Sequence, residues 1–198
     1  MRSAFDKLIS GAGLVLAAVL LIGGGLMAWA NVYIGNQVED QLSMQAITMP
    51  EGEALASLPE DDAAALEEYA GSPLDTGAEA KAYADHYILA HMNAASDGRT
   101  YEEVSGEYIA LSDEDKASED GQALAGLRQT LFMGNTLRGL LLYGSAFATM
   151  GTIAGIGAVV AFAGSLILLV LVALGLRHAR RAEAASGQIS SERVPQPA

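Results

Sequence analysis

Two long uncharged stretches, rich in apolar residues, dominate the pattern of hydrophobic and polar positions along the chain. The first runs from Leu8 to Val38 and the second from Gly139 to Leu176. A bilayer core about 30 Å thick is crossed by roughly 20 helical residues, so either stretch is long enough for a transmembrane helix. The pattern predicts an all-α membrane protein with two transmembrane helices and a small helical domain between them.

The first stretch predicts a transmembrane helix over residues 8–30. Ala28, Trp29 and Ala30 also have the small-x-small pattern of a signal-peptide cleavage site. The run is longer than the roughly 7 to 15 apolar residues of an ordinary signal peptide, and Asp6 dilutes the basic residues before it. We therefore expect an uncleaved anchor, with cleavage after Ala30 as the alternative.

The second stretch is too long for one simple crossing and slightly short for two. A helix over residues 139–176 would be about 57 Å long, whereas two passes need roughly 40 residues and a turn. We expect one long helix whose membrane part covers residues 150–174 and whose start, from about Leu124, lies outside the membrane. A helical hairpin over 139–176 is the alternative.

Residues 31–149 have the pattern of a small helical domain. Three Ser/Thr-x-x-Glu sequences, beginning at Ser57, Thr76 and Thr100, match the helix capping box, and amphipathic runs follow them. Only Ala46–Met49, closed by a proline, favours an extended conformation. The apolar content is low for an independent core, so we expect this domain to pack on extensions of the long helices or on a partner.

The distribution of charge predicts the orientation. Residues 31–138 carry 21 acidic and five basic side chains, whereas the flanks, 1–7 and 175–198, are slightly basic. Basic residues beside membrane helices stay in the cytoplasm, which predicts a plasma-membrane protein with cytoplasmic termini and an acidic extracytoplasmic domain. Nucleic acid would be repelled by that domain. The polar tail from Ala182 is expected to be disordered.

Candidate chemistry is sparse along the chain. There is no cysteine, and neither a nucleophile elbow nor a phosphate loop is present. His86 and His91 would point about 140° apart on a helix, so we interpret them as structural rather than as metal ligands. The adjacent acidic pairs lack calcium-loop spacing and are typical of a solvated face. We expect no enzymatic activity, no metal and no cofactor.

Small residues recur along one face of each apolar stretch. Steps of four and three through the second stretch give Gly144, Ala148, Gly151, Gly155, Ala158, Phe162 and Ser165, and the first stretch contributes Gly13, Ala17, Gly24 and Ala28. Such stripes let helix backbones approach closely in lipid. We expect the two helices to pack on each other, with docking of another membrane protein or a second copy as the alternative.

Two arginines precede the second apolar stretch. Arg138 is the one charged member of a seam with three- and four-residue spacing, which otherwise contains Leu124, Leu127, Leu131, Gly134 and Leu141. Its guanidinium would contact either lipid phosphate or a carboxylate of the acidic domain. Arg128 lies about 80° around the same helix, and the two together could hold the acidic domain.

Three segments resemble a family of short uncharacterised actinobacterial membrane proteins. They cover residues 75–92, 98–108 and 127–154, and the most specific string is LR-x-T-L-F-x-G-x-T-LRG-LLL. The resemblance implies an N-terminal span, an outer domain and a C-terminal membrane segment. Members have carried a ring-opening dioxygenase name, but that chemistry needs an iron site with placed His and carboxylate ligands, and the pattern of this chain does not predict one.

Two functions fit these features. The first is a non-enzymatic accessory or assembly component of a cell-envelope or respiratory membrane complex. The second is an extracytoplasmic ligand-binding or sensor module, with a pocket lined by Tyr83, Tyr87, His91, Tyr101 and Tyr108. The candidate interaction residues are Arg128, Arg138, Gly144, Gly151, Gly155, Ala158, Tyr87 and His91.

Overall fold

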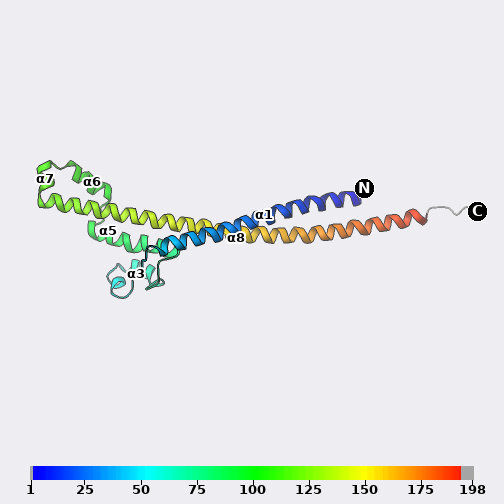
Figure 1. Ribbon diagram of the computed structural model, residues 1–198, viewed down its shortest axis with the longest axis horizontal. Helices are drawn as coiled ribbons and strands as arrows, with labels where there is room; N and C mark the ends of the chain where they lie inside the picture. The colour runs from blue at the N-terminus through cyan, green and yellow to red at the C-terminus, as the bar shows by residue number, and fades with distance from the viewer. Residues whose placement is uncertain (1, 193–198) are drawn as a thin grey trace, which may run out of the picture. The chain divides into compact units, whose positions relative to one another are not determined.

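The computed structural model describes residues 2–192, and this part of the chain is helical apart from turns and one isolated β-bridge. Two long apolar helices, α1 (Arg2–Ser43) and α8 (Glu119–Glu192), flank a helical middle segment (Figure 1). The middle segment contains α2 (Glu53–Ala56), α3 (Glu60–Glu67), α4 (Gly77–Ala82), the π-helix η1 (Tyr83–Ile88), α5 (Leu89–Ser96), α6 (Tyr101–Ala110) and α7 (Asp113–Ala117).

The chain divides into two compact units, to which both long helices contribute. The first, here called the helical pair, comprises residues 2–32 of α1 and 152–192 of α8. The second, here called the middle unit, is Tyr33–Gly151. The two long helices are long and apolar enough to cross a membrane, judged by length and composition.

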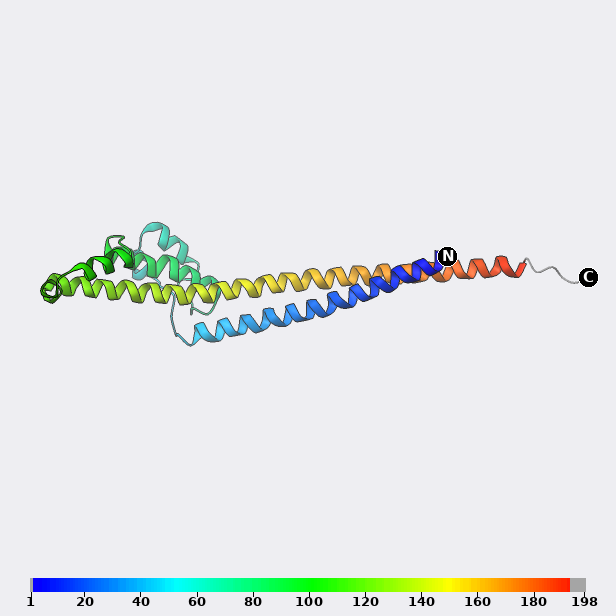
Figure 2. The same cartoon turned by 90° about the horizontal axis from the view of Figure 1, so that it is seen from above.

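In the helical pair the two helices are antiparallel and closely packed. A Cβ atom built on Gly175 would lie 2.6 Å from the Ser10 hydroxyl oxygen, and one on Gly155 would lie 2.9 Å from the Asn31 amide nitrogen. Later residues of α1 therefore contact earlier residues of α8. Figure 2 also shows the opposite directions of the blue and orange helices. Midway, the Ser165 hydroxyl donates a 3.0 Å hydrogen bond to a backbone carbonyl oxygen of α1, that of Ala17.

The buried positions of the helical pair recur every seven residues. The positions in this repeat are Ser10, Ala17 and Gly24 on α1, and Ala158, Ser165, Val172 and Ala179 on α8; Ala161, three residues after Ala158, is also buried. A seven-residue repeat corresponds to 3.5 residues per turn, which is the period of a left-handed coiled coil. Small side chains at these positions let the two backbones approach closely.

The outer surface of the helical pair is more apolar than its interface. Large side chains such as Leu14, Ile22, Ile156 and Leu166 are between 52% and 67% exposed, while the buried positions hold mainly Ala, Gly and Ser. A soluble coiled coil has the opposite arrangement, with large apolar side chains in its seam and polar ones outside. The pair therefore presents apolar side chains to its surroundings.

The middle unit has two small cores built on the long helices. The larger joins Val38 and Leu42 of α1 and Leu141 of α8 to buried residues of the short segments, namely Met49, Leu66, Leu74, Ala80 and Ala84. The smaller joins Met92 of α5, Val104 of α6 and Leu131 of α8. The short helices thus bury their apolar residues against extensions of α1 and α8, as expected from their low apolar content.

Local signals in the sequence place two of the three expected helix starts. Thr76 and Thr100 form complete capping boxes at α4 and α6. The expectation for Ser57 is wrong: α3 begins at Glu60 after Pro59, and Ser57 ends α2 instead. A proline disfavours helical dihedrals in the residue before it, here Leu58, so a helix cannot readily start there. The extended segment is confirmed around Thr48, which forms the β-bridge with Pro73, but Ala46 has a left-handed φ of 50° and belongs to the turn after α1.

Helix α8 decides between the two alternatives for residues 139–176 and corrects the expectation for the tail. It is one uninterrupted helix over residues 139–176, so the hairpin alternative is wrong. It also continues to Glu192, so the tail expected to be disordered from Ala182 is helical over its described part. Ala, Glu and Gln are good helix formers, and no proline interrupts the segment before Pro195. Residues 193–198 lie outside the described residues.

Candidate functional site

Arg138 connects α8 to the π-helix η1 within the middle unit. Its Nε donates a 2.9 Å hydrogen bond to the Ala84 carbonyl oxygen, and its Nη2 lies 3.0 Å from the Asp85 carboxylate. The Ala84 carbonyl also accepts the Leu89 N–H. A π-helix turn is wider than an α-helical one and is often found at functional positions. Of the two expected contacts of Arg138, the structure contains the one with a carboxylate.

Asp85 lies between two cations. Lys81, one turn earlier on α4, pairs with one carboxylate oxygen, and Arg138 pairs with the other. Burial alone would raise the pKa of Asp85, but the hydrogen bonds and charges of Lys81 and Arg138 outweigh it and hold that pKa below its ordinary value. The carboxylate is therefore ionised at neutral pH, and the Asp85–Arg138 pair is only about one-fifth exposed.

Glu79 is a second structural carboxylate and is 8% exposed. It accepts hydrogen bonds from the backbone N–H groups of Asp75 and Thr76 and from the hydroxyls of Ser72 and Thr76. Burial would raise its pKa, yet these four donors lower it below the ordinary 4.5. The Glu79 carboxylate thus caps the start of α4 and holds the preceding turn by hydrogen bonds.

Arg128 contacts aromatic rings and a hydroxyl of α6. Its Nε donates a 2.9 Å hydrogen bond to the Ser105 hydroxyl. Its guanidinium carbon lies 6.0 Å from the ring centre of Tyr101 and 5.4 Å from that of Tyr108. Both arginines therefore fasten the short helices to α8, which is one of the two alternatives left open by the sequence, and Arg128 does so through a hydrogen bond and cation–π contacts.

The two candidate histidines have separate local partners. His86 Nδ1 lies 2.9 Å from the Asp62 carboxylate of α3, and His91 Nδ1 lies 2.8 Å from the Tyr87 carbonyl oxygen. The rings of Tyr83 and Tyr87 stack 4.7 Å apart, and those of Tyr87 and His91 are 4.4 Å apart. No group of three or more potential metal ligands occurs among the residues that the structure describes.

Most of the small residues in the α8 stripe lie against α1, whereas Ala148 lies against Gly77 of α4. Within the middle unit, a Cβ on Gly144 would lie 3.7 Å from Leu42, and Gly151 is buried. Within the helical pair, Gly155 lies against Asn31, and Ala158 is 3% exposed. Phe162, the one large member of the stripe, is 40% exposed, but its ring lies 3.0 Å from a Cβ built on Gly24 of α1. These contacts correspond to the expected packing of the two long helices on each other.

A cavity of about 600 Å³ opens on the middle unit. The end of α1, the start and end of η1, and α8 all contribute to its wall. Its lining includes Tyr33, Gln37, Gln41, Gln45, Gly144 and Phe147. Of the aromatic residues expected to form a pocket, Tyr83 lines this cavity, whereas Tyr87, His91, Tyr101 and Tyr108 do not. Sequence patterns did not identify it, because it joins segments far apart in the chain.

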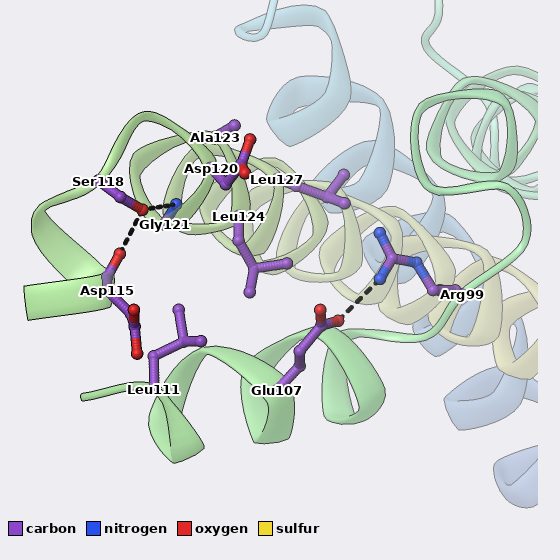
Figure 3. A pocket seen from close by; sticks show the side chains of 10 residues that line it. All are labelled: Arg99, Glu107, Leu111, Asp115, Ser118, Asp120, Gly121, Ala123, Leu124 and Leu127. Carbon is purple, nitrogen blue, oxygen red and sulfur yellow. Dashed lines mark hydrogen bonds and ion pairs between the residues drawn. The ribbon is translucent and has the colours of Figure 1, made fainter.

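A second cavity, of about 480 Å³, lies between α6, α7 and the start of α8 (Figure 3). Leu111, Leu124 and Leu127 form its apolar side, and an ion pair of 2.9 Å between Arg99 and Glu107 crosses one edge. Both members of that pair are between 43% and 55% exposed. This cavity is wide open, and its Arg99 and Glu107 already pair with each other, so its geometry favours no particular ligand.

Comparison of the chain with protein-family models, curated proteins and solved structures found no match.

Proposed function

We propose that the chain is an integral membrane protein with two transmembrane helices and an extracytoplasmic helical domain between them. Its proposed role is that of a non-enzymatic accessory or assembly component of a cell-envelope or respiratory membrane complex. The apolar outer surface of the helical pair supports the membrane location, because lipid is the environment that such a surface suits. The basic residues beside both long helices support cytoplasmic termini.

One exposed stripe of the middle unit carries the proposal of a partner. Met133, Leu137, Leu140 and Phe147 lie within about 80° of one another around α8. Each of them is between 51% and 62% exposed. A domain outside the membrane seldom leaves such a contiguous apolar stripe in water, and a stripe of this kind marks a protein or membrane contact. The small residues support a partner less, since they face α1.

The charged groups of the middle unit support a structural role rather than catalysis. Glu79, Asp85 and Arg138 each bind backbone groups or opposite charges within the unit. Arg128 is held between a hydroxyl and two aromatic rings. Such groups fix the short helices on α8, and their hydrogen-bonding capacity is largely used in doing so.

Purification in mild detergent tests the partner directly. The tagged chain is extracted from its native membrane, and co-eluting proteins are quantified by mass spectrometry. We expect Met133→Glu to remove the partner by placing a charge in the stripe. Asn135→Glu adds the same charge at an exposed position on another side of α8 and is expected to retain it.

Two results would contradict the assembly role. One is recovery of the wild-type chain only as a bare monomer. The other is a set of co-eluting proteins that is identical for the wild type and Met133→Glu. Recovery of a second copy of the chain, lost in Met133→Glu, would identify the partner as the protein itself.

A ligand-binding role is the second candidate, and the 600 Å³ cavity favours it. Small-molecule sites commonly have volumes of roughly 300 to 1,000 Å³. Leu137, Leu140 and Phe147 of the stripe also line this cavity, whereas Met133 does not, so Met133→Glu tests the partner without altering the cavity wall.

A further inference from the structure

The 600 Å³ cavity has an uncharged wall in a strongly acidic protein. None of the residues that line it is Asp, Glu, Lys, Arg or His. The whole chain, by contrast, is 18% charged and has a formal net charge of −13. An ionic ligand would find no opposite charge in this wall, and burying it there would carry an uncompensated desolvation cost. The cavity therefore fits a neutral molecule.

Three glutamines form one edge of the cavity, and Tyr33, Tyr83 and Tyr143 add phenol groups from α1, η1 and α8. Gln37 and Gln41 lie one helical turn apart near the end of α1, Gln45 follows in the turn after it, and all three side chains are exposed. Each amide offers a donor and an acceptor without a charge. Val38, Leu42 and Leu141, which also line the cavity, belong to the larger core of the middle unit. The cavity thus combines an apolar floor with a neutral hydrogen-bonding edge.

We propose that this cavity binds an uncharged lipid, with its hydrocarbon tail on the apolar floor and a hydroxyl or carbonyl head on the glutamine edge. The ligand class follows from the two-sided wall and from the lack of charge. This proposal rests on the proposed membrane location, which supplies lipid to a site beginning at Tyr33, directly after the apolar run of α1. It does not depend on a protein partner, although Leu137, Leu140 and Phe147 belong both to the cavity wall and to the exposed stripe.

Other occupants fit the cavity less well. Anionic phospholipids would bring a phosphate to a wall without cations, in a unit whose acidic residues repel it. A helix of another protein needs an elongated groove that receives anchors at positions i, i+3, i+4 and i+7. The volume here is that of a small-molecule site.

Photo-crosslinking of the full chain in phosphatidylcholine vesicles tests the proposal. The probe is a photoreactive diacylglycerol, and unlabelled diacylglycerol and phosphatidylglycerol are the competitors. We expect labelled peptides from residues 33–47 and 137–147, with competition by diacylglycerol alone. Gly144→Leu is expected to lower labelling about tenfold, equivalent to roughly 1.4 kcal/mol of binding free energy.

The choice of variants follows from the surroundings of each glycine. A Cβ on Gly144 would make an ordinary 3.7 Å contact with Leu42, so a leucine there directs its larger part into the cavity. Gly139→Leu is the matched control, because nothing lies within 4 Å of a Cβ at that position of α8. Gln41→Glu puts a charge on the edge and serves as a second variant if Gly144→Leu fails to fold.

The proposal is overturned by any of three outcomes. These are labelling that is not concentrated in the two cavity segments, equal competition by phosphatidylglycerol, and wild-type labelling of folded Gly144→Leu or Gln41→Glu. Crosslinks to another polypeptide in place of lipid would also overturn it. Met133→Glu separates the two proposals, since it should lose the protein partner and keep the lipid label.

Discussion

Arg138 and Asp85, 53 residues apart in the chain, form an ion pair of 3.0 Å that fastens η1 to α8. The same guanidinium also binds the Ala84 carbonyl oxygen, so one side chain satisfies both a charge and a backbone acceptor. Together with Leu141, three residues further along α8 and buried, it anchors the larger core of the middle unit. The pair is thus a structural clasp.

Removal of this clasp should destabilise the middle unit. We expect Arg138→Leu to lower the free energy of unfolding by about 1–3 kcal/mol, because Asp85 and the Ala84 carbonyl lose a partly buried partner. Thermal unfolding in detergent, followed by circular dichroism, measures the change. Arg99→Leu is the control, and its exposed pair with Glu107 should contribute less than about 1 kcal/mol. Equal losses in the two variants would show that Arg138 is not a clasp.

Acid should destabilise the same unit through Glu79 and Asp85. The folded-state pKa of each lies below its ordinary value, which is 4.5 for Glu79 and 3.8 for Asp85. The unfolded chain therefore takes up protons first as pH falls. Their stabilisation is complete above about pH 4.5 and is lost as pH falls through the folded pKa values. Unfolding curves of Glu79→Gln between pH 7 and pH 3 should depend less on pH than those of the wild type.

Gly77 allows α4 to lie directly on α8. A Cβ at Gly77 would lie 3.2 Å from the Ser145 Cα and would collide with the Ala148 side chain. We expect Gly77→Ala to destabilise the protein by about 1–3 kcal/mol through overpacking. Gly106→Ala, in open space within α6, should instead stabilise it by about 0.5–1 kcal/mol. Thermal unfolding of both variants measures whether stability falls in one and rises in the other. Unchanged stability of Gly77→Ala would contradict this close contact.

A disulfide can report the antiparallel register of the helical pair. The Ser10 Cβ lies 3.9 Å from a Cβ built on Gly175, which is within the range of disulfides. The chain has no native cysteine, so the double variant Ser10→Cys/Gly175→Cys should crosslink on mild oxidation. Gel mobility with and without reductant detects it. Ser10→Cys/Gly164→Cys should stay open, and crosslinking there would indicate a different register.

Cysteine labelling can test the proposed orientation separately. Ala94→Cys in α5 and Ala184→Cys in α8 place single thiols at exposed positions. In intact cells we expect an impermeant maleimide to label position 94 and to reach position 184 only after the membrane is opened. Labelling of position 184 from outside would refute cytoplasmic termini.

The sequence predicted those elements whose signals are local. Thr76 and Thr100 each cap a helix with a glutamate three residues later, and these contacts need no other part of the chain. The same pattern at Ser57 was misleading, since Pro59 acts on the residue before it. Spacing along the long apolar stretches also placed the small residues on one face, because a helix repeats at fixed intervals.

The partners of the candidate residues were much less predictable. Asp85 is one of many acidic residues between the apolar stretches, and its position in the sequence does not identify it as the partner of Arg138. Its four-residue step from Lys81 was the one available signal. The glutamine edge was missed because Gln37, Gln41 and Gln45 form a site only when α8 packs beside them. Contacts between distant segments depend on packing that local patterns do not encode.

The π-helix also has a consequence for the register of the segment that contains it. Ala80, Ala84, Ile88 and Met92 follow steps of four, and in a regular α-helix each step would turn the next residue by about 40°. The wider η1 turn absorbs this drift, so that Ala80 and Ala84 reach one core and Met92 reaches the other. The π-helical turn contains one residue more than an α-helical turn would. Deleting a single residue there would rotate Met92 by about 100°, a change that no substitution at the same positions reproduces.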